Sequence, residues 1–390
     1  MKVVKLVLFF CSGALFMGPA AWFLPLAHAS QDTIRGTTTS APIVVIGSVN
    51  MDIVIEVDRF PRAGETVVTQ DPKTGKTVPG GKGANQAVAA ARFTEGTGRR
   101  AQFVCQFGND AFARTLEQTL GDHKVDISGA GHSREHPSGQ GYVLLQPDGG
   151  VSSIVIGGSN AAWPGAPMEE GPLRSMVRGA AAVMLQREVP EHVNEAVAAE
   201  AHAAGVPVIH DVGGEDRPIS DALLRLVTYL APNLSELRRL SGLPIEGETD
   251  EEVVAAARAL QARGARSVLV TLGSRGSILV PPPPGGEGGG AVLRQAPFKI
   301  PGATGKVVDE TGAGDCYRAA FAVALVEGRP LQECMHYASA AGALAASRMG
   351  AVPAIPSRRE LDALAAQPGM LSASASASAS AATATGDGNR

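Results

Sequence analysis

Aromatic residues, cysteine and excess charge are all scarce in this sequence. Phe, Trp and Tyr make up 4% of the 390 residues, too few for a platform on which the bases of single-stranded nucleic acid stack. The formal net charge is −4 at pH 7, so the basic footprint of a nucleic-acid-binding protein is missing as well. The four cysteines form no CxxC pair and no metal-ligating spacing, a usage typical of a reducing compartment.

The two ends of the chain differ from its middle. Two lysines precede a mostly apolar run over residues 6–26, and Ala27-His28-Ala29 resembles a small-residue cleavage site. We predict a targeting leader and linker over residues 1–42, with no stable membrane association after its removal. The alternative is a retained anchor, although glycines and prolines interrupt the run. Residues 367–390, a low-complexity tail, and the Pro/Gly loop at 281–290 are predicted to be disordered.

The middle of the chain alternates between apolar runs and helical patterns. Buried strands are predicted at 43–48, 101–107, 182–186, 206–211, 226–232 and 267–272, and helices at 83–93, 110–120, 191–204 and 251–263. This alternation predicts a domain over 43–366 with an α/β fold, a three-layer sandwich of a mainly parallel sheet covered by helices on both faces. Ligands in such folds bind past the carboxyl ends of the strands.

Two segments break the alternation. Residues 53–79 and 139–155 have the pattern of short strands with turns, such as the one at 147–150, and neither has a helix partner. We predict that they form a small β-sheet over the main sheet, which serves as a lid or a dimer surface. The alternative is an edge extension of the main sheet.

A carboxylate stands at each end of the run DETGAGD, residues 309–315. The run follows Val307-Val308, which we interpret as the end of a strand, and precedes an apolar helix. Asp315 is then either the N-cap of that helix or the neighbour of a phosphate bound at the helix N-terminus. The motif alone leaves both interpretations open.

Two further motifs follow the first predicted strand. Asn50 and Asp52 flank Met51, so both side chains share one face of an extended segment and suit hydrogen bonds to the hydroxyls of a sugar. The alternative is an Asx turn. The run PGGKGANQ, 79–86, opens an Ala-rich helix with glycines that permit close approach of a ligand. It lacks the Walker A spacing GxxxxGK[ST].

Polar residues also follow the later strands. Glu188 lies just past the strand at 182–186. Asn233 and Glu236 follow the strand at 226–232, either as a capping box or as a site for nucleotide phosphate and hydrated Mg²⁺. Residues 271–276 form a strand–turn–strand that either contacts phosphates or is a plain hairpin.

The order of these motifs resembles the ribokinase branch of the phosphofructokinase-B sugar kinase family. The resemblance runs from about residue 43 to 356, and the segments 185–190 and 211–214 look most like plant and algal members. It implies ATP-dependent phosphorylation of D-ribose at O5 to ribose 5-phosphate and ADP, with Mg²⁺ and K⁺, in a homodimer joined through the lid. A plastid location is expected, with the cytoplasm as the alternative. Alternative functions are a kinase for another pentose, a nucleoside or pseudouridine, an exported sugar-binding protein, and a sensor.

The resemblance also implies residue roles. Asp315 is the general base, and the N–H groups of Gly312, Ala313 and Gly314 form the anion hole. The sugar pocket comprises Asn50, Met51, Asp52, Gly80, Gly81, Lys82, Gly83, Asn85, Glu188 and Asp315. The nucleotide site comprises Asn233, Thr271, Leu272, Gly273, Ser274, Arg275, Gly276, Gly314, Asp315 and Ser339. Glu236 holds Mg²⁺ through water, and K⁺ lies among Asp309, Thr311, Ala345, Arg348, Gly350 and Ala354, where Ala354 replaces a common Ser.

Overall fold

The computed structural model describes residues 40–71, 74–146, 151–169, 171–214, 216–283, 285, 289–302 and 305–367. Nearly all of the predicted leader and tail, the turn at 147–150 and part of the 281–290 loop lie outside these ranges. Within them, no helix has the length and hydropathy needed to cross a bilayer.

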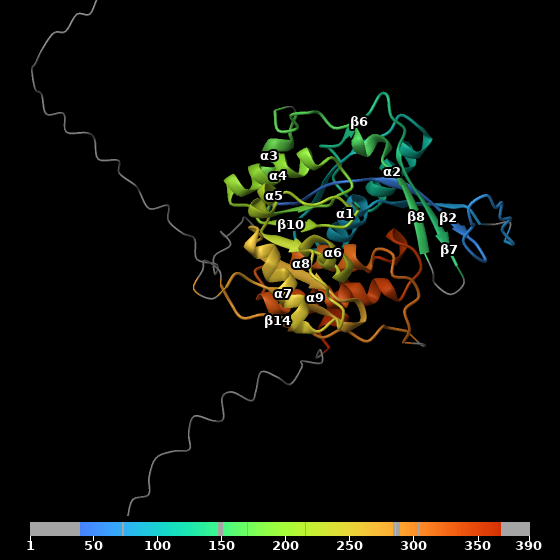
Figure 1. Cartoon of the computed structure of the whole chain (residues 1–390). Coiled ribbons are helices and arrows are strands. Elements are labelled where there is room, and N and C mark those ends of the chain that lie inside the picture. Colours follow the sequence, from blue (N-terminus) through green and yellow to red (C-terminus); the bar gives the residue numbers. More distant parts are fainter. Residues whose placement is uncertain are drawn as a thin grey trace, which may run out of the picture.

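An eight-stranded sheet forms the centre of the molecule, and its mainly parallel character confirms the predicted fold (Figure 1). The strand order is β14-β13-β12-β11-β10-β9-β1-β4, with parallel pairing from β4 to β12 and antiparallel pairing from β12 to β14. The strands are β1 (Ile43–Ile46), β4 (Ala101–Val104), β9 (Ala182–Leu185), β10 (Val208–Asp211), β11 (Tyr229–Ala231), β12 (Ser267–Thr271), β13 (Ser277–Val280) and β14 (Leu293–Gln295). Each of the six predicted strands is present, and each is shorter than its apolar run.

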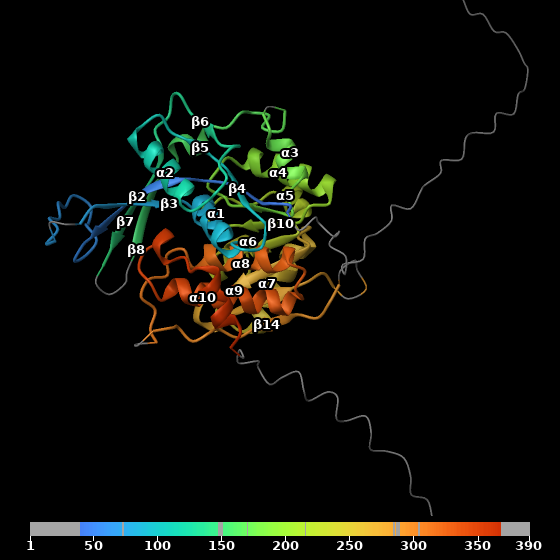
Figure 2. The same cartoon turned by 180° about the vertical axis from the view of Figure 1, so that it is seen from behind.

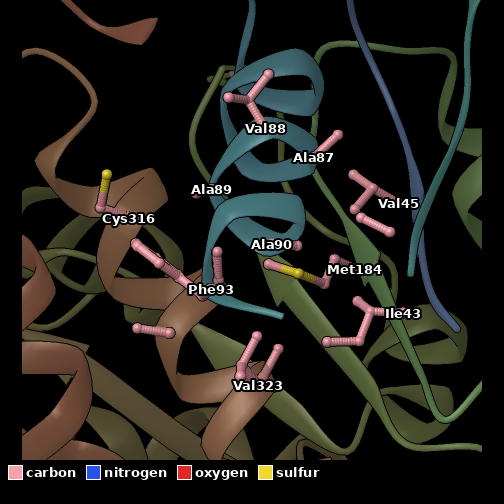
Figure 3. Packing of buried hydrophobic residues seen from close by; sticks show 14 of the residues in the cluster. Ile43, Val45, Ala87, Val88, Ala89, Ala90, Phe93, Met184, Cys316 and Val323 are labelled. Carbon is pink, nitrogen blue, oxygen red and sulfur yellow. The ribbon is translucent and has the colours of Figure 1, made fainter. Parts of the chain in front are cut away.

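Helices cover both faces of this sheet, which explains why its strands are apolar without alternation. Ile43 and Val45 point into one core and Val44 and Ile46 into the other. The first core packs against α1 (Lys82–Phe93), α2 (Ala111–Asp122), α8 (Ala313–Val326), α9 (Leu331–Ala346) and α10 (Arg358–Ala365), and the second against α3 (Leu173–Arg178), α4 (Glu191–Ala204), α5 (Asp221–Leu226), α6 (Leu234–Ser241) and α7 (Asp250–Ala262). Figure 3 shows part of the first core around α1.

A second, separate sheet extends from one side of the body in both views (Figures 1 and 2). Its order is β3-β2-β7-β8, with β2 (Asn50–Glu56), β3 (Lys76–Gly80), β7 (Gly139–Leu145) and β8 (Val151–Ile156). None of these strands pairs with the main sheet in the described residues, so the alternative of an edge extension is wrong. Strand β2 begins at Asn50, whereas the lid was predicted to begin at residue 53. Asn50 and Asp52 therefore belong to this lid sheet.

Short elements complete the described fold. They are β5 (Gln106–Phe107), β6 (Gly131–His132) and the 3₁₀ turns η1 (Gly158–Ala161), η2 (Gly273–Arg275) and η3 (Val352–Ala354). The prediction of a strand that ends at Val307-Val308 is wrong. The N–H of Val308 donates to the carbonyl of Ala346 at the end of α9 instead of to a strand, and both valines are about half exposed.

Candidate active site

The side chain of Asp315 is buried inside the first turn of α8. Gly312 is the N-cap, in the left-handed region with φ 76°, and no side chain caps the helix there. Asp315 is the third helical residue, and its two carboxylate oxygens accept hydrogen bonds of 3.0 Å each from Nδ2 of Asn85 and Nε2 of Gln86. The N-cap interpretation of Asp315 is therefore wrong. The geometry holds a carboxylate in a fixed orientation at the mouth of a helix.

The environment of Asp315 shifts its titration toward neutral pH. Burial raises its pKa to about 6, the charge of Lys82 opposes the shift, and the charge of Asp211 adds to it. A carboxylate with a pKa near 6 is mostly ionised at pH 7 and remains able to take a proton. This combination suits a general base.

Charged side chains surround this carboxylate. The ammonium of Lys82 lies 3.3 Å from Oδ2 of Asp211, and Nε of Arg318 lies at the same distance from that oxygen. Burial lowers the pKa of Lys82, but the carboxylates of Asp211 and Asp315 raise it by more, so the ammonium stays charged. Asp211 thus forms an ion pair with each of two cations, which share its single negative charge.

The strand end that carries Asp211 leads into two glycines that make room for other groups. A side chain at Gly213 would come within 2.5 Å of Oε1 of Glu236 and 2.7 Å of Nζ of Lys82. A side chain at Gly214 would meet Cγ of Glu188 at 2.5 Å. The segment after β10 therefore holds the carboxylate of Glu236 and the ammonium of Lys82 against the same backbone.

Asn233 and Glu236 form the capping box of α6. The Asn233 side chain accepts from the N–H of Glu236 at 2.9 Å, and Oε2 of Glu236 accepts from the N–H of Asn233 at 2.8 Å. The structural interpretation of this pair is thus confirmed. Because Oε1 of Glu236 points instead toward Gly213 and Lys82, the pair also lines a cavity.

This cavity has a volume of about 600 Å³ and lies past the carboxyl ends of β11 and β12. Its walls include the charged side chains of Lys82, Glu236 and Arg318 and apolar side chains such as Phe298 and Val307. Its full lining is Lys82, Asn233, Leu234, Ser235, Glu236, Thr271, Leu272, Gly273, Ser274, Gly276, Pro297, Phe298, Ile300, Val307, Glu310, Gly312, Ala313, Gly314, Asp315, Tyr317, Arg318, Ser339, Gly342, Ala343 and Ala346. The hydroxyl of Ser339 is buried without a hydrogen-bond partner in the described residues.

Two predicted nucleotide or phosphate contacts are already engaged with protein groups. The guanidinium of Arg275 bonds the carbonyl of Glu248 and lies 3.4 Å from its carboxylate, and Arg275 does not line the cavity. The N–H of Ala313 donates to the carbonyl of Glu310 at 3.1 Å. The N–H of Ala313 is therefore already used, which leaves those of Gly312 and Gly314 as the candidate donors of the predicted anion hole.

The lid sheet places Asn50 and Asp52 on one face. Both are covered by glycines of the neighbouring strand: a side chain at Gly139 would meet Oδ1 of Asn50 at 2.3 Å, and one at Gly141 would meet Oδ1 of Asp52 at the same distance. Asn160 donates to Oδ1 of Asn50 at 2.7 Å and orients it. Glycine is required at these positions because the polar side chains occupy the space where a Cβ would lie.

Asp52 and Glu188 form a pair of nearby carboxyl groups. Burial and the charge of Glu188 together raise the pKa of Asp52 to about 6, although the N–H of Gly141 opposes the shift. Oε2 of Glu188 accepts from the hydroxyl of Ser48 at 2.5 Å and from the N–H of Lys82 at 3.0 Å. Through Lys82, this cluster of acceptors borders the cavity that contains Asp315.

Some of the predicted sugar residues have structural roles in the described fold. Met51 points into the core and is 2% exposed. Gly81 and Gly83 leave room for the backbone at Ser48 and Asn50, which a Cβ would approach to within 3.1 Å or less. Gly80 lies against Asp52, whose Oδ2 would be 2.0 Å from a Cβ.

The carboxylate of Asp309 joins the two segments predicted to hold a cation. Its Oδ1 accepts from the N–H and hydroxyl of Thr311 at 2.9 and 2.6 Å, and its Oδ2 accepts from the N–H of Gly350 at 2.8 Å. Ala345 and Ala354, which flank Gly350 in the sequence, are fully buried. The side chain of Arg348 forms an ion pair with Glu360. In the described residues, His, Cys, Asp and Glu form no group of three or more that would hold a metal ion by side chains alone.

Sequence reasoning missed four residues of this site. Asp211 is a carboxylate at the end of a predicted strand. The same signal, a carboxylate at a strand end, identified Glu188 and would have identified Asp211. Gln86 directly follows the chosen Asn85. Arg318 and Asn160 carried no such signal, because their roles depend on contacts across the fold.

Comparison with known proteins shows which family the chain belongs to. The model of the pfkB family of carbohydrate kinases matches residues 40–384. The chain belongs to this family. A ribokinase from Arabidopsis thaliana is 42% identical over 326 residues, 82% of this chain and 80% of the relative. The resemblance inferred from the motifs is thus confirmed.

Solved structures of relatives share the fold. The structure of Arabidopsis thaliana ribokinase complexed with ribose and ATP has a TM-score of 0.75 at 41% identity and covers 84% of this chain and 100% of its own. A ribokinase from Thermotoga maritima has a TM-score of 0.70 at 30% identity, with 83% and 99% covered. The three-layer arrangement of this kinase is therefore that of its family.

Proposed function

We propose that this protein transfers the γ-phosphoryl group of ATP to O5 of D-ribose, giving ribose 5-phosphate and ADP. The observation that carries the proposal is the position of Asp315. This buried carboxylate lines the 600 Å³ cavity at the N-terminus of α8, and Lys82 borders both that cavity and the acceptor cluster of the lid. The plant relative described as complexed with ribose and ATP supports the choice of substrates.

In the proposed reaction, Asp315 takes the proton of the sugar hydroxyl as the bond from O5 to the γ-phosphorus forms. The bond from that phosphorus to the bridging oxygen breaks, and ADP leaves. Asn85 and Gln86 hold the carboxylate in place, so little reorganisation is needed. The helix N-terminus at Gly312 and Gly314 provides N–H donors and positive potential for the phosphoryl oxygens.

The sugar is proposed to bind between the lid and the start of α1. Asn50, Asp52 and Glu188 present carboxylate and amide oxygens, which suit the several hydroxyls of a pentose. Leaving such buried groups unpaired costs about 1–3 kcal/mol each, so the cluster selects for a polyhydroxylated ligand. A nucleoside would require apolar or aromatic cover for its base. The described lid residues 139–145 and 151–155 include one aromatic side chain, Tyr142, and its hydroxyl donates to Gln140. The lid therefore favours a sugar over a nucleoside.

ATP is proposed to fill the cavity. Its phosphates would lie beside Lys82, and its base beside the apolar side chains of Phe298 and Val307.

Two metal ions are proposed to assist the transfer. Mg²⁺ keeps most of its waters and requires few carboxylates, so Oε1 of Glu236 fits it; an ion bound there would neutralise phosphate charge. Asp309 fits K⁺ because it already links the turn at Thr311 to the loop at Gly350; a cation there adds positive field beside the anion hole.

The lid is also proposed as a dimer surface. Strand β8 is at the edge of the lid sheet, and Ile154, Val155 and Ile156 on it are 65%, 56% and 48% exposed. An apolar edge strand of this kind favours pairing with another chain.

A plastid location is proposed from the leader. A reporter fused to residues 1–45 that stays in the cytosol would contradict it.

A substrate panel tests the function. Purified protein is supplied with ATP, Mg²⁺ and K⁺ and with D-ribose, other pentoses, nucleosides or pseudouridine, and the product is identified by phosphorus NMR. We expect D-ribose to have the highest kcat/KM and the phosphate to be on O5. A higher kcat/KM for a nucleoside would overturn the substrate, and binding of ribose without turnover would favour a sugar-binding protein.

A further inference from the structure

Arg318 is buried in the wall of the proposed nucleotide cavity. It lies one turn after Gly314 on α8, and 3% of its surface is exposed. Its Nε and Nη2 donate to the carbonyl of Ala231 at 3.1 and 2.7 Å. The same nitrogens lie 3.3 Å from the carboxylate of Asp211 and 3.9 Å from that of Glu236. One edge of the guanidinium is thus held from three sides.

The other edge is free. Nη1 has no hydrogen-bond partner among the residues that the structure describes, and it lies against Gly314. A Cβ on Gly314 would be 2.7 Å from it. Gly314 belongs to the turn that forms the proposed anion hole, so the unused donors of Arg318 are beside the position assigned to the transferring phosphoryl group.

Burying an arginine costs free energy, and a buried N–H donor without an acceptor adds to that cost. A purely structural arginine would direct all of its N–H groups to protein acceptors. Here protein groups bind one edge of the guanidinium, and the other edge faces Gly314 in the wall of the cavity. A guanidinium recognises phosphate oxygens with parallel donors, and fixed positive charge in a buried site stabilises a phosphoryl transition state.

We propose that Arg318 is a further catalytic residue of this kinase, which donates from Nη1 to the phosphoryl group as it moves from ATP to the acceptor. Its Nη2 also lies 3.9 Å from the carboxylate of Glu236. This inference rests on the proposed function, because it requires a nucleotide in the cavity.

Arg358 provides a matched control. Like Arg318, it contacts one backbone carbonyl, that of Phe93, at 2.5 Å and two carboxylates, those of Glu327 and Asp362, at 2.6 and 3.3 Å. It is on α10 and does not line the cavity. Replacing either arginine by methionine removes a comparable set of contacts, but only one replacement removes a donor from the cavity.

The experiment compares Arg318→Met, Arg318→Lys and Arg358→Met in saturating ATP and acceptor. We expect Arg318→Met to lower kcat by about 10²-fold, the effect of losing one preorganised donor, with the acceptor KM nearly unchanged. Lysine should restore part of the loss. Arg358→Met should lower the Tm but keep kcat within about threefold, as a substitution away from the site does.

Chemical rescue gives a second measurement. Arg318→Ala leaves a space that opens to the cavity, so added methylguanidinium, at concentrations too low to denature, should raise its kcat and not that of Arg358→Met. Wild-type kcat in Arg318→Met, with a fall in Tm like that of Arg358→Met, would overturn the proposal. If the wild type phosphorylates another acceptor and not ribose, only the ribose assignment is overturned. The Arg318 and Arg358 variants are then compared on that acceptor. Absence of any kinase activity in the wild type overturns both.

Discussion

Replacing Asp211 by asparagine changes one oxygen into an NH₂ group in the most highly charged part of the site. Oδ2 of Asp211 accepts from Nε2 of Gln86 at 3.1 Å and faces Lys82 and Arg318, each at 3.3 Å. Oδ1 accepts from the N–H of Gly213 at 2.9 Å. Either orientation of an asparagine side chain therefore points an N–H at a donor.

The loss of stability follows from the buried charges. Asp211 is 1% exposed, and without its charge Lys82 and Arg318 lose the carboxylate that they share. Breaking a buried pair in this way costs about 3–5 kcal/mol. For a domain of this size, about 2 °C of Tm corresponds to each kcal/mol. We expect the Tm of Asp211→Asn to fall by about 6–10 °C.

The same substitution moves the pH dependence of catalysis in a defined direction. The charge of Asp211 is one cause of the raised pKa of Asp315. A neutral asparagine removes that cause, so the pKa of Asp315 falls below its wild-type value of about 6. Since the base acts in its ionised form, the acid limb of kcat/KM moves to lower pH.

The assay combines thermal unfolding with kcat/KM measured from pH 5 to pH 8. Glu95→Gln is the control, because Glu95 forms an exposed ion pair with Lys124 at 2.8 Å; its Tm should stay within about 1 °C, since such pairs contribute little. An unchanged Tm in Asp211→Asn would refute the shared-charge argument. An acid limb that stays in place or moves upward would refute the coupling to Asp315.

Three further predictions concern the base, the lid and the cation. Asp315→Asn should lower kcat by at least about 10²-fold, the usual contribution of a general base, with ATP affinity by calorimetry retained; near-normal turnover would contradict the role. Gly141→Ala places a Cβ 2.3 Å from Oδ1 of Asp52, so the ribose KM should rise by at least about tenfold, or 1.4 kcal/mol, and the ATP KM should hold; equal changes would indicate misfolding. K⁺ should raise turnover over Na⁺ at constant ionic strength, and Asp309→Asn should weaken that response; identical rates with and without K⁺, in protein freed of bound ions, would remove the cation site.

The sequence by itself determined the layers of the fold and the order of the chemical motifs. The strands of the main sheet were recognisable because burial on both faces leaves continuous apolar runs such as 43–46. The glycine turn before Asp315 was recognisable because a helix N-terminus needs few residues to define it. Both signals are local, so the chain carries them without reference to its other parts.

Only the tertiary structure decided which side chains meet. Val307-Val308 has the composition of a strand, but it pairs with no strand among the described residues, and Val307 lines the cavity instead. Arg318 is in an apolar helix, and nothing in its local sequence shows that it reaches Asp211 and Glu236 on other elements. A charge buried among distant partners is stabilised by contacts whose geometry depends on how helices and strands pack, and that packing is absent from local pattern. The folded site therefore contains a network of charges, whereas the sequence indicated a series of separate motifs.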